Sequence, residues 1–450
     1  MRREIQFNRS LHVCVMLWLC LLPLGCFAQG VLTVDSAVVE ALQNSPQAKA
    51  ILKERDAKRV GIDREKPVAR PIADARLSGT LQGNPVRFPR PDGSQAMFLP
   101  DRFLRLELNI EQIVYRPGIG AARRRYASQL VVADEETRKA QGELALAVTK
   151  AYFDVLKAEA GVVQAQDGLA FALRYRVFVE GQITAGVAKP VDLETVKAQV
   201  SEAEAAQVTA TNGLILAKMN FNRLLGRPLE TEVNLSSTLQ SPLSSDDPKS
   251  ATETALKRRP EIRLIDANLI GTKEGAFLAK TQTQPSMIVR GQAAEQTPTA
   301  LLPETYYALT LEIRIPIFDG GKAKSEAEEA RIQGERLFAL REEAINGIKI
   351  EVMQASLQRT EAKAKSVSAS AKVKSAEATL RVAEKAYEVG RGTLIEVQNA
   401  RRELETALTL FNRTTYDDVL RSEALYRHVQ GLDVPENVTP ENRKAGKRSK

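Results

Sequence analysis

Two spacings of apolar residues divide this chain into strands and helices. The odd positions from 307 to 317 are all apolar, and residues such as Glu312 and Arg314 lie between them. The even positions from 104 to 110 repeat this alternation. A period of two residues is typical of a strand with one apolar and one polar face. The pattern therefore predicts two strands, over about 103–114 and about 306–317.

A weaker alternating segment precedes each of these strands. We predict partner strands over about 74–84 and 286–296, and proline-rich loops at 87–101 and 297–305 join each pair. Strands of about ten residues are long enough to cross a bilayer when tilted. Aromatic residues lie near their ends, where interfacial girdles form in membrane barrels: Phe103, Tyr115, Tyr307 and Phe318. A soluble sandwich with its apolar faces packed together is the alternative.

The second spacing alternates steps of three and four residues. It runs, for example, through Val148, Ala151, Val155 and Ala158, and it recurs in both halves of the chain. A seven-residue repeat of this kind makes left-handed coiled coils. Alanine at many of its positions lets the helix backbones approach closely. The pattern predicts four long helices, over about 121–182, 191–224, 322–389 and 394–428.

The order helix, strand, strand, helices occurs twice. ALQNSPQAKA at 41–50 resembles ALKRRPEIRL at 255–264, and VYRPG at 114–118 resembles IFDGG at 317–321. Such internal repetition indicates a structure built from one duplicated unit. We predict a first repeat, a linker and a second repeat, over 29–225, 226–247 and 248–430.

Helix lengths constrain the architecture. The helix after Gly120 contains about 60 residues and is roughly 90 Å long, whereas the returning helix 191–224 covers half of that length. The first helix of each repeat, about 33–66 or 248–280, has the length of the other half. We therefore predict one continuous rod in each repeat, flanked by two shorter rods stacked end to end.

The strand count constrains the assembly. Four strands cannot close a membrane barrel, and open sheet edges are not tolerated in lipid. Bacterial barrels contain eight or more strands. A chain with four membrane strands must therefore oligomerise, and three copies that supply twelve strands are a simple solution.

The first 28 residues have the features of a secretory signal peptide. Three arginines and an apolar run precede Cys26 and Ala28, which are small residues three and one positions before a cut. A membrane anchor is one alternative. Cleavage before Cys26, with lipidation of that cysteine, is another, because Leu24-Gly25-Cys26 resembles a lipobox. All three cysteines lie in this segment, so a chain cut after Ala28 has neither disulfides nor thiol chemistry.

The formal charge of +8 is concentrated at the ends of the chain. The signal segment carries a net +2 and residues 441–450 carry +4, which leaves about +2 for the body. This balance is not the footprint of a protein that binds nucleic acid. We expect the basic tail 431–450 to be solvated and disordered. His428 is the one histidine outside the signal segment, which excludes a His-rich zinc site or a Ser-His-Asp triad. We therefore expect no enzyme, metal or cofactor.

Several features together resemble the TolC family of outer membrane efflux proteins, over about residues 32–432. They are the duplicated unit, the Ser45-Pro46 and Arg259-Pro260 helix starts, the corner IPIFDGGKA at 315–323, and the hairpin tips at 184–193 and 388–397. The resemblance implies an α+β membrane protein that forms a homotrimer. Its twelve-stranded β-barrel would lie in the lipid of the outer membrane and continue as a long α-helical coiled-coil barrel in the periplasm.

The resemblance also implies a function. Members of this family are passive exit ducts of tripartite efflux pumps or of type I protein secretion systems. Their partners are a periplasmic adaptor protein and an inner-membrane RND or ABC transporter, which supplies the energy. A function of a different class, a structural coiled-coil scaffold of the cell envelope, would need no membrane strands. The sequence itself identifies no exported substrate.

The hairpin tips are the candidate gate. In the family, an aspartate of the first repeat pairs with a tyrosine and an arginine of the second repeat and keeps the periplasmic entrance shut. Asp192 and Tyr387 match the aspartate and the tyrosine. Gly392 stands at the arginine position and Arg391 is its neighbour, which puts the arginine contact in doubt.

Acidic rings and tip turns complete the candidate site. The family has two acidic rings at its constriction; Glu396 matches the first and Asn399 the second, so one ring would be uncharged. Threefold symmetry turns one carboxylate into a ring of three, which favours cations. The adaptor is expected to contact the turns at both tips, at Gly186, Val187, Ala188, Gly390, Arg391 and Gly392.

Ordinary structural roles compete with the gate at these positions. Thr393 and Glu396 have the spacing of a capping box. Asp192 lies in the first turn after Pro190, where a negative charge suits the helix dipole. Tyr387 falls on the heptad core, and the tip glycines suit tight turns. The contacts of these side chains distinguish the two interpretations.

Overall fold

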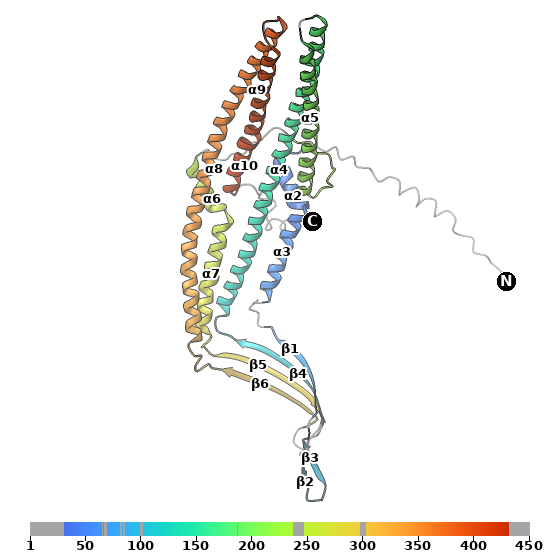
Figure 1. Ribbon diagram of the computed structural model, residues 1–450. Helices are drawn as coiled ribbons and strands as arrows, with labels where there is room; N and C mark the ends of the chain where they lie inside the picture. Colours follow the sequence, from blue (N-terminus) through green and yellow to red (C-terminus); the bar gives the residue numbers. More distant parts are fainter. Residues whose placement is uncertain are drawn as a thin grey trace, which may run out of the picture.

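A computed structural model describes residues 31–431 with short gaps, and Figure 1 shows its elongated shape. Long helical rods run from two hairpin tips at one end to a curved sheet at the other. The signal segment with Cys26, the tail from 432 and the tip residue Val187 lie outside the described residues, as do the other gaps at 65, 67–69, 82, 84–85, 100–101, 237–246 and 298–302.

Each repeat supplies helices, two long strands and a helical hairpin. The first repeat contains α2 (Val34–Asn44), α3 (Pro46–Asp63), β1 (Ile72–Leu81), β2 (Val86–Pro89), β3 (Gln95–Leu99), β4 (Arg102–Tyr115), α4 (Ile119–Thr184) and α5 (Pro190–Leu225). The second contains α6 (Pro248–Arg258), α7 (Pro260–Thr281), β5 (Ser286–Gln296), β6 (Thr305–Arg314), α8 (Lys322–Glu388), α9 (Leu394–Arg413), a π-helix (Thr414–Leu420) and α10 (Arg421–Val429).

The four long strands form one antiparallel sheet in the order β1-β4-β5-β6. The central strands β4 and β5 come from different repeats, so the sheet joins the two halves of the chain. The register places Leu108 opposite both Ala75 and Ala293, which fixes the apolar residues on one face. The outer strands β1 and β6 each have one unpaired side within the described chain.

The rods pack as the helix lengths predict. The long helix α4 contacts α5 toward the tips and α2 and α3 toward the sheet, and α2 also contacts the end of α5. Helix α7 lies between α4 and α8. None of the helices in the described residues combines the length and the apolar run that crossing a bilayer requires.

The main apolar core lies where α2, α4 and α5 meet. Tyr152, Phe153 and Phe221 are fully buried there, and the rings of Phe153 and Phe221 pack edge-on against Tyr152. The Tyr152 hydroxyl lies 2.8 Å from the carbonyl of Leu32 and 2.7 Å from that of Ser236. It thereby fixes the chain before α2 to the segment after α5.

Two left-handed glycines lock the helix breaks in the same way in both repeats. Gly226 ends α5 with a φ of 77°, and a Cβ there would lie 2.9 Å from the backbone of Asn44 and Ser45. Gly431 follows α10 with a φ of 67° and packs against Arg258, at the break between α6 and α7. Only glycine adopts this backbone conformation without strain, so the duplication extends to these joints.

Two local features are absent from the sequence prediction. The loop predicted at 87–101 contains the antiparallel hairpin β2–β3 around a turn at Gly93. The helix predicted over 394–428 is interrupted by the π-helix Thr414–Leu420. A π-helical segment is bonded from residue i to residue i+5 and is usually a short insertion in an α-helix. The apolar spacing on either side of it remains helical, so the sequence pattern does not reveal the insertion.

Candidate functional site

The two hairpin tips are close copies of one turn. Gly186 and Gly390 have φ values of 73° and 71°. Beyond them the chain bonds back to its own helix: the Ala188 amide donates to the Gln182 carbonyl, and the Gly392 amide donates to Ala386. The left-handed glycine therefore has a structural role in each turn, and Arg391 is exposed after the second of them.

The two acidic candidates both cap helices. An Oδ2 atom of Asp192 accepts a hydrogen bond from the Lys189 amide at 3.0 Å, at the start of α5. Glu396 does the same at the start of α9, where its Oε2 atom accepts from the Thr393 amide at 2.9 Å. Within a single chain, helix capping explains the position of both carboxylates. The two caps are at equivalent places in the two repeats.

Tyr387 lies at the joint between the hairpins. It is the penultimate residue of α8, and its ring packs 6.1 Å from Tyr175 and 5.9 Å from Phe178, both on α4. Burial raises the pKa of Tyr387, and the nearby carboxylate of Asp192 raises it further. No hydrogen bond joins Asp192 to Tyr387 in the described residues, so the two are neighbours without direct pairing.

Position 392, where the family has its gate arginine, holds a glycine in this chain. Arg391 makes no ion pair with Asp192 among the described residues. At Gly392 a Cβ would lie 3.1 Å from both Ala386 Cβ and the Tyr387 amide nitrogen, which is tighter than most real contacts. A side chain at 392 would therefore require the neighbouring atoms of the turn to shift by a few tenths of an ångström. Asn399 stands at the position of the family's second acidic ring and is uncharged. Its side-chain oxygen accepts a hydrogen bond from the Arg402 guanidinium at 2.9 Å.

An aromatic cluster near the tips was not predicted from the sequence. Phe171, Tyr175 and Phe178 follow one face of α4 and meet Tyr387 of the other hairpin. Their spacing of four and three residues places them on one face of a helix, but it does not indicate what that face packs against. Which element covers that face depends on how the two hairpins pack, and the pattern within one helix does not contain that information.

The sheet has inverted polarity. Its apolar face, with Leu108 and Leu311, is exposed, whereas the opposite face carries half-buried charged side chains. Arg290 bonds to Glu111 and Glu312 at 3.2 Å each. The register places four acidic and four basic residues of the described strands on this polar face, namely Asp74, Glu107, Glu111, Glu312, Arg76, Arg105, Arg290 and Arg314. This face therefore carries no net charge.

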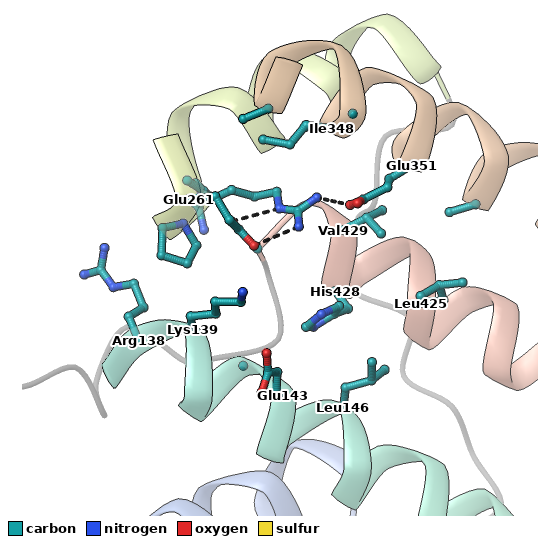
Figure 2. A pocket seen from close by; sticks show the side chains of 18 of the residues that line it. Arg138, Lys139, Glu143, Leu146, Glu261, Ile348, Glu351, Leu425, His428 and Val429 are labelled. Carbon is teal, nitrogen blue, oxygen red and sulfur yellow. Dashed lines mark hydrogen bonds and ion pairs between the residues drawn. The ribbon is translucent and has the colours of Figure 1, made fainter. Parts of the chain in front are cut away.

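A hollow of about 1030 Å³ lies where the repeats meet at the middle of the rods (Figure 2). Arg259, at the start of α7, bonds to Glu261 at 2.9 Å and pairs with Glu351 of α8. Burial opposes ionisation of Glu261, but the bonds from Arg259 outweigh it and hold the pKa of that carboxyl below its ordinary value. The network is internally paired, and it ties the start of α7 to α8.

Comparison with known proteins connects this geometry to a family. The family model for outer membrane efflux proteins matches residues 251–429, which cover most of the second repeat. The second repeat therefore matches the outer membrane efflux protein family. The solvent efflux pump outer membrane protein SrpC of Pseudomonas putida is 21% identical over 257 residues, which are 56% of this chain and 55% of the relative. The pyoverdine export outer membrane protein OpmQ of the same species is 24% identical over 189 residues, 39% of this chain and 38% of the relative.

The chain aligns with about half the length of these curated efflux proteins or less. Solved structures cover more of it. The Campylobacter jejuni CmeC outer membrane channel superposes with a TM-score of 0.71 at 16% identity, over 92% of this chain and 88% of that one. The open state of the Neisseria gonorrhoeae MtrE outer membrane channel gives 0.65 at 18% identity, over 89% of each chain. The chain therefore has the fold of these outer membrane channels.

Proposed function

We propose that this protein is the outer-membrane exit duct of a tripartite efflux pump. It would be a passive channel that carries solutes from a periplasmic adaptor and an inner-membrane transporter to the outside. The inverted polarity of the sheet carries this proposal. A sheet in water turns its apolar face toward a protein core, and among the described residues no core covers the exposed row at Leu104, Leu106, Leu108 and Ile110. Lipid supplies the missing apolar surroundings.

The open edges of the sheet support a homotrimer. One chain leaves one side of β1 and one side of β6 unpaired, and unpaired strand edges are costly in lipid. Pairing of β6 with β1 of the next copy would close a twelve-stranded barrel in a trimer. The charged face with Arg290 would then line the pore, where water solvates the paired charges.

The pump partners follow from the family and its named members. Solvent efflux and pyoverdine export are activities of small-molecule systems, which favours efflux over type I protein secretion for this chain. An adaptor would contact the tip turns, at Gly186, Val187, Ala188, Gly390, Arg391 and Gly392. RND and ABC transporters both remain compatible with these tips.

Purification from the outer membrane tests the proposal directly. We expect trimers that dissociate on heating, ion conductance in planar bilayers, and increased accumulation of a fluorescent efflux dye in cells that lack the protein. A structural scaffold predicts a water-soluble rod without conductance, and that result would sink the channel. Unchanged dye accumulation combined with loss of a secreted protein would instead favour type I secretion.

The gate assigned to Asp192 needs a test that separates charge from capping. Asp192→Asn keeps a hydrogen-bond acceptor for the Lys189 amide but removes the charge, and Glu396→Gln is the matched change in the second repeat. If the carboxylates hold the entrance closed, both variants conduct severalfold more than the wild type. If the residues only cap their helices, both variants conduct like the wild type.

A further inference from the structure

The joint between the two hairpins is built around one tyrosine. Tyr175 stacks on Phe171 with ring centroids 5.6 Å apart and planes 8° apart, and it also contacts Phe178 and Tyr387. Phe171, Tyr175 and Phe178 belong to α4 of the first hairpin, whereas Tyr387 belongs to α8 of the second. The ring of Tyr175 is therefore the centre of a contact that holds one hairpin against the other.

The surroundings of this ring come from both repeats. One apolar cluster contains Tyr175, Val179 and Val196 of the first hairpin together with residues of the second, namely Ala376, Leu380, Val397, Ala400, Leu404 and Ala407. The small alanines allow close approach of the helices. Parting the hairpins would expose this cluster, so its burial favours the joined arrangement.

The hydroxyl of Tyr175 acts in the opposite direction. The residue is only 8% exposed, and its hydroxyl oxygen has no hydrogen-bond partner in the described residues. A buried polar group without a partner is destabilising, because it has lost its bonds to water. Phenylalanine would provide the same ring contacts at this position without that cost. The hydroxyl regains water when the hairpins part, so it favours the parted arrangement.

We propose that Tyr175 sets the balance between a closed and an open periplasmic entrance. Its ring joins the second hairpin to the first, and its buried hydroxyl weakens that joint. The inference rests on the proposed channel function and adds a residue of the first repeat to the gate. Tyr175 is a positioning residue, because it acts on the entrance through the packing of the hairpins.

Opposite effects of two substitutions at position 175 test the proposal. In planar bilayers we expect Tyr175→Phe to reduce the open fraction of purified trimers by about tenfold, since it removes the unpaired hydroxyl. We expect Tyr175→Ala to increase the open fraction by about tenfold, since it removes the ring contacts. A residue that served stability alone would not shift the open fraction in opposite directions. Tyr175→Leu replaces the alanine variant if that variant does not form trimers.

The matched control is Tyr126→Phe. Tyr126 lies on the same helix, about 70 Å closer to the sheet, and its hydroxyl bonds to Asp63. We expect this variant to conduct like the wild type. Conductance of Tyr175→Phe at or above the wild-type level would overturn the role of the hydroxyl, and wild-type conductance of both Tyr175→Ala and Tyr175→Leu would overturn that of the ring.

A distance measurement separates this inference from the channel function. Every cysteine of the sequence lies in the first 28 residues, so Ala188→Cys and Arg391→Cys place one spin-label pair across the two tips of each chain. Added Tyr175→Phe should narrow the distance distribution and added Tyr175→Ala should broaden it. If the wild type did not conduct, the proposed function would be wrong, and these distances would still decide whether Tyr175 joins the hairpins. Identical distributions would overturn the inference.

Discussion

The two repeats build the same hairpin from rods that are buried differently. Helix α4 contacts α2, α3, α5, α7 and α9 and is the central rod of the chain. Helix α8 lies at the edge, and large apolar side chains on it remain exposed, such as Phe338 at 63% and Ile350 at 66%. Similar heptad patterns therefore do not produce similar burial. The first repeat supplies the core of the chain, and the second presents a side that the proposed trimer would cover.

The repeats also start their second helix by different means. Ser45 precedes α3, is buried, and accepts a hydrogen bond from the Ala48 amide at 3.2 Å. Arg259 precedes α7, makes no such cap, and pairs with Glu261 and Glu351 instead. Both residues stand before a proline at the same place of the repeat. Duplication has preserved the backbone geometry there, while the side-chain chemistry has diverged from a neutral cap to an ion-pair network.

Arginine substitutions on the apolar face of the sheet should affect both repeats alike. They give the largest expected loss of stability. Leu108 and Leu311 occupy equivalent positions of β4 and β6 and are 52% and 57% exposed. Leu108→Arg and Leu311→Arg should each cost about 2–4 kcal/mol per chain if these faces contact lipid. We expect both variants to lose heat-modifiable trimers from the outer membrane to a similar extent, measured on semi-native gels.

Asn109→Arg is the control for these strand variants. Asn109 is the next residue of β4, points to the polar face and bonds to Asp74 at 3.3 Å. An arginine at 109 would meet that carboxylate, so we expect trimers at the wild-type level. Equal losses in Asn109→Arg and Leu108→Arg would mean that the two faces are not distinguished by lipid. A loss in only one of the two leucine variants would break the equivalence of the repeats.

Sequence patterns predicted the sheet and the rods well, because both periodicities are sustained. The strand 286–296 and the boundaries of α4 and α5 lie within about two residues of the prediction. The repeated landmarks also fixed the order of the elements. The π-helix and the hairpin β2–β3 were missed, since one adds a residue without disturbing the apolar spacing and the other is short and contains prolines. Local patterns do not encode such departures.

The candidate site was predicted less completely than the fold. The sequence indicated Asp192, Tyr387 and Glu396, and the structure places all three at the tips. It could not indicate that Tyr175 would meet Tyr387, because that contact depends on the relative position of two helices far apart in the chain. The steric reason for glycine at 392 was equally hidden, since it lies in the backbone of the preceding turn.

The ion-pair network in the second repeat gives the next largest effect. The Arg259 side chain is largely buried and bonds to two carboxylates, so Arg259→Ala should destabilise the helical part by about 2 kcal/mol. Thermal unfolding followed by circular dichroism measures this loss. Glu351→Gln, which leaves the Arg259–Glu261 pair intact, should cost less. If Arg259→Ala were as stable as the wild type, the ion pairs of Arg259 would contribute nothing to the free energy of unfolding.

The same network predicts a pH dependence that the Ser45 cap of the first repeat lacks, because serine does not titrate. The pKa of Glu261 is lowered in the folded protein, where the bonds from Arg259 outweigh the effect of burial. A lowered carboxyl pKa contributes stability above the unfolded-state pKa, and this stability is lost as the pH falls through the folded-state pKa. The difference in melting temperature between wild type and Arg259→Ala should therefore shrink in acid. A constant difference down to low pH would contradict the role of the carboxylate.

Removal of the neutral Ser45 cap in the first repeat should give the smallest loss of stability. Removing a serine cap costs about 1 kcal/mol, so Ser45→Ala should lower stability by roughly half as much as Arg259→Ala. Ser45→Asp restores an acceptor for the Ala48 amide, but it buries a charge beside Gly226 and should not recover the wild-type stability. Since Ser45 does not titrate, the loss in Ser45→Ala should be the same at neutral and acidic pH. A pH-dependent loss would mean that the two helix starts share one electrostatic network, and the repeats would then be less independent than their side chains indicate.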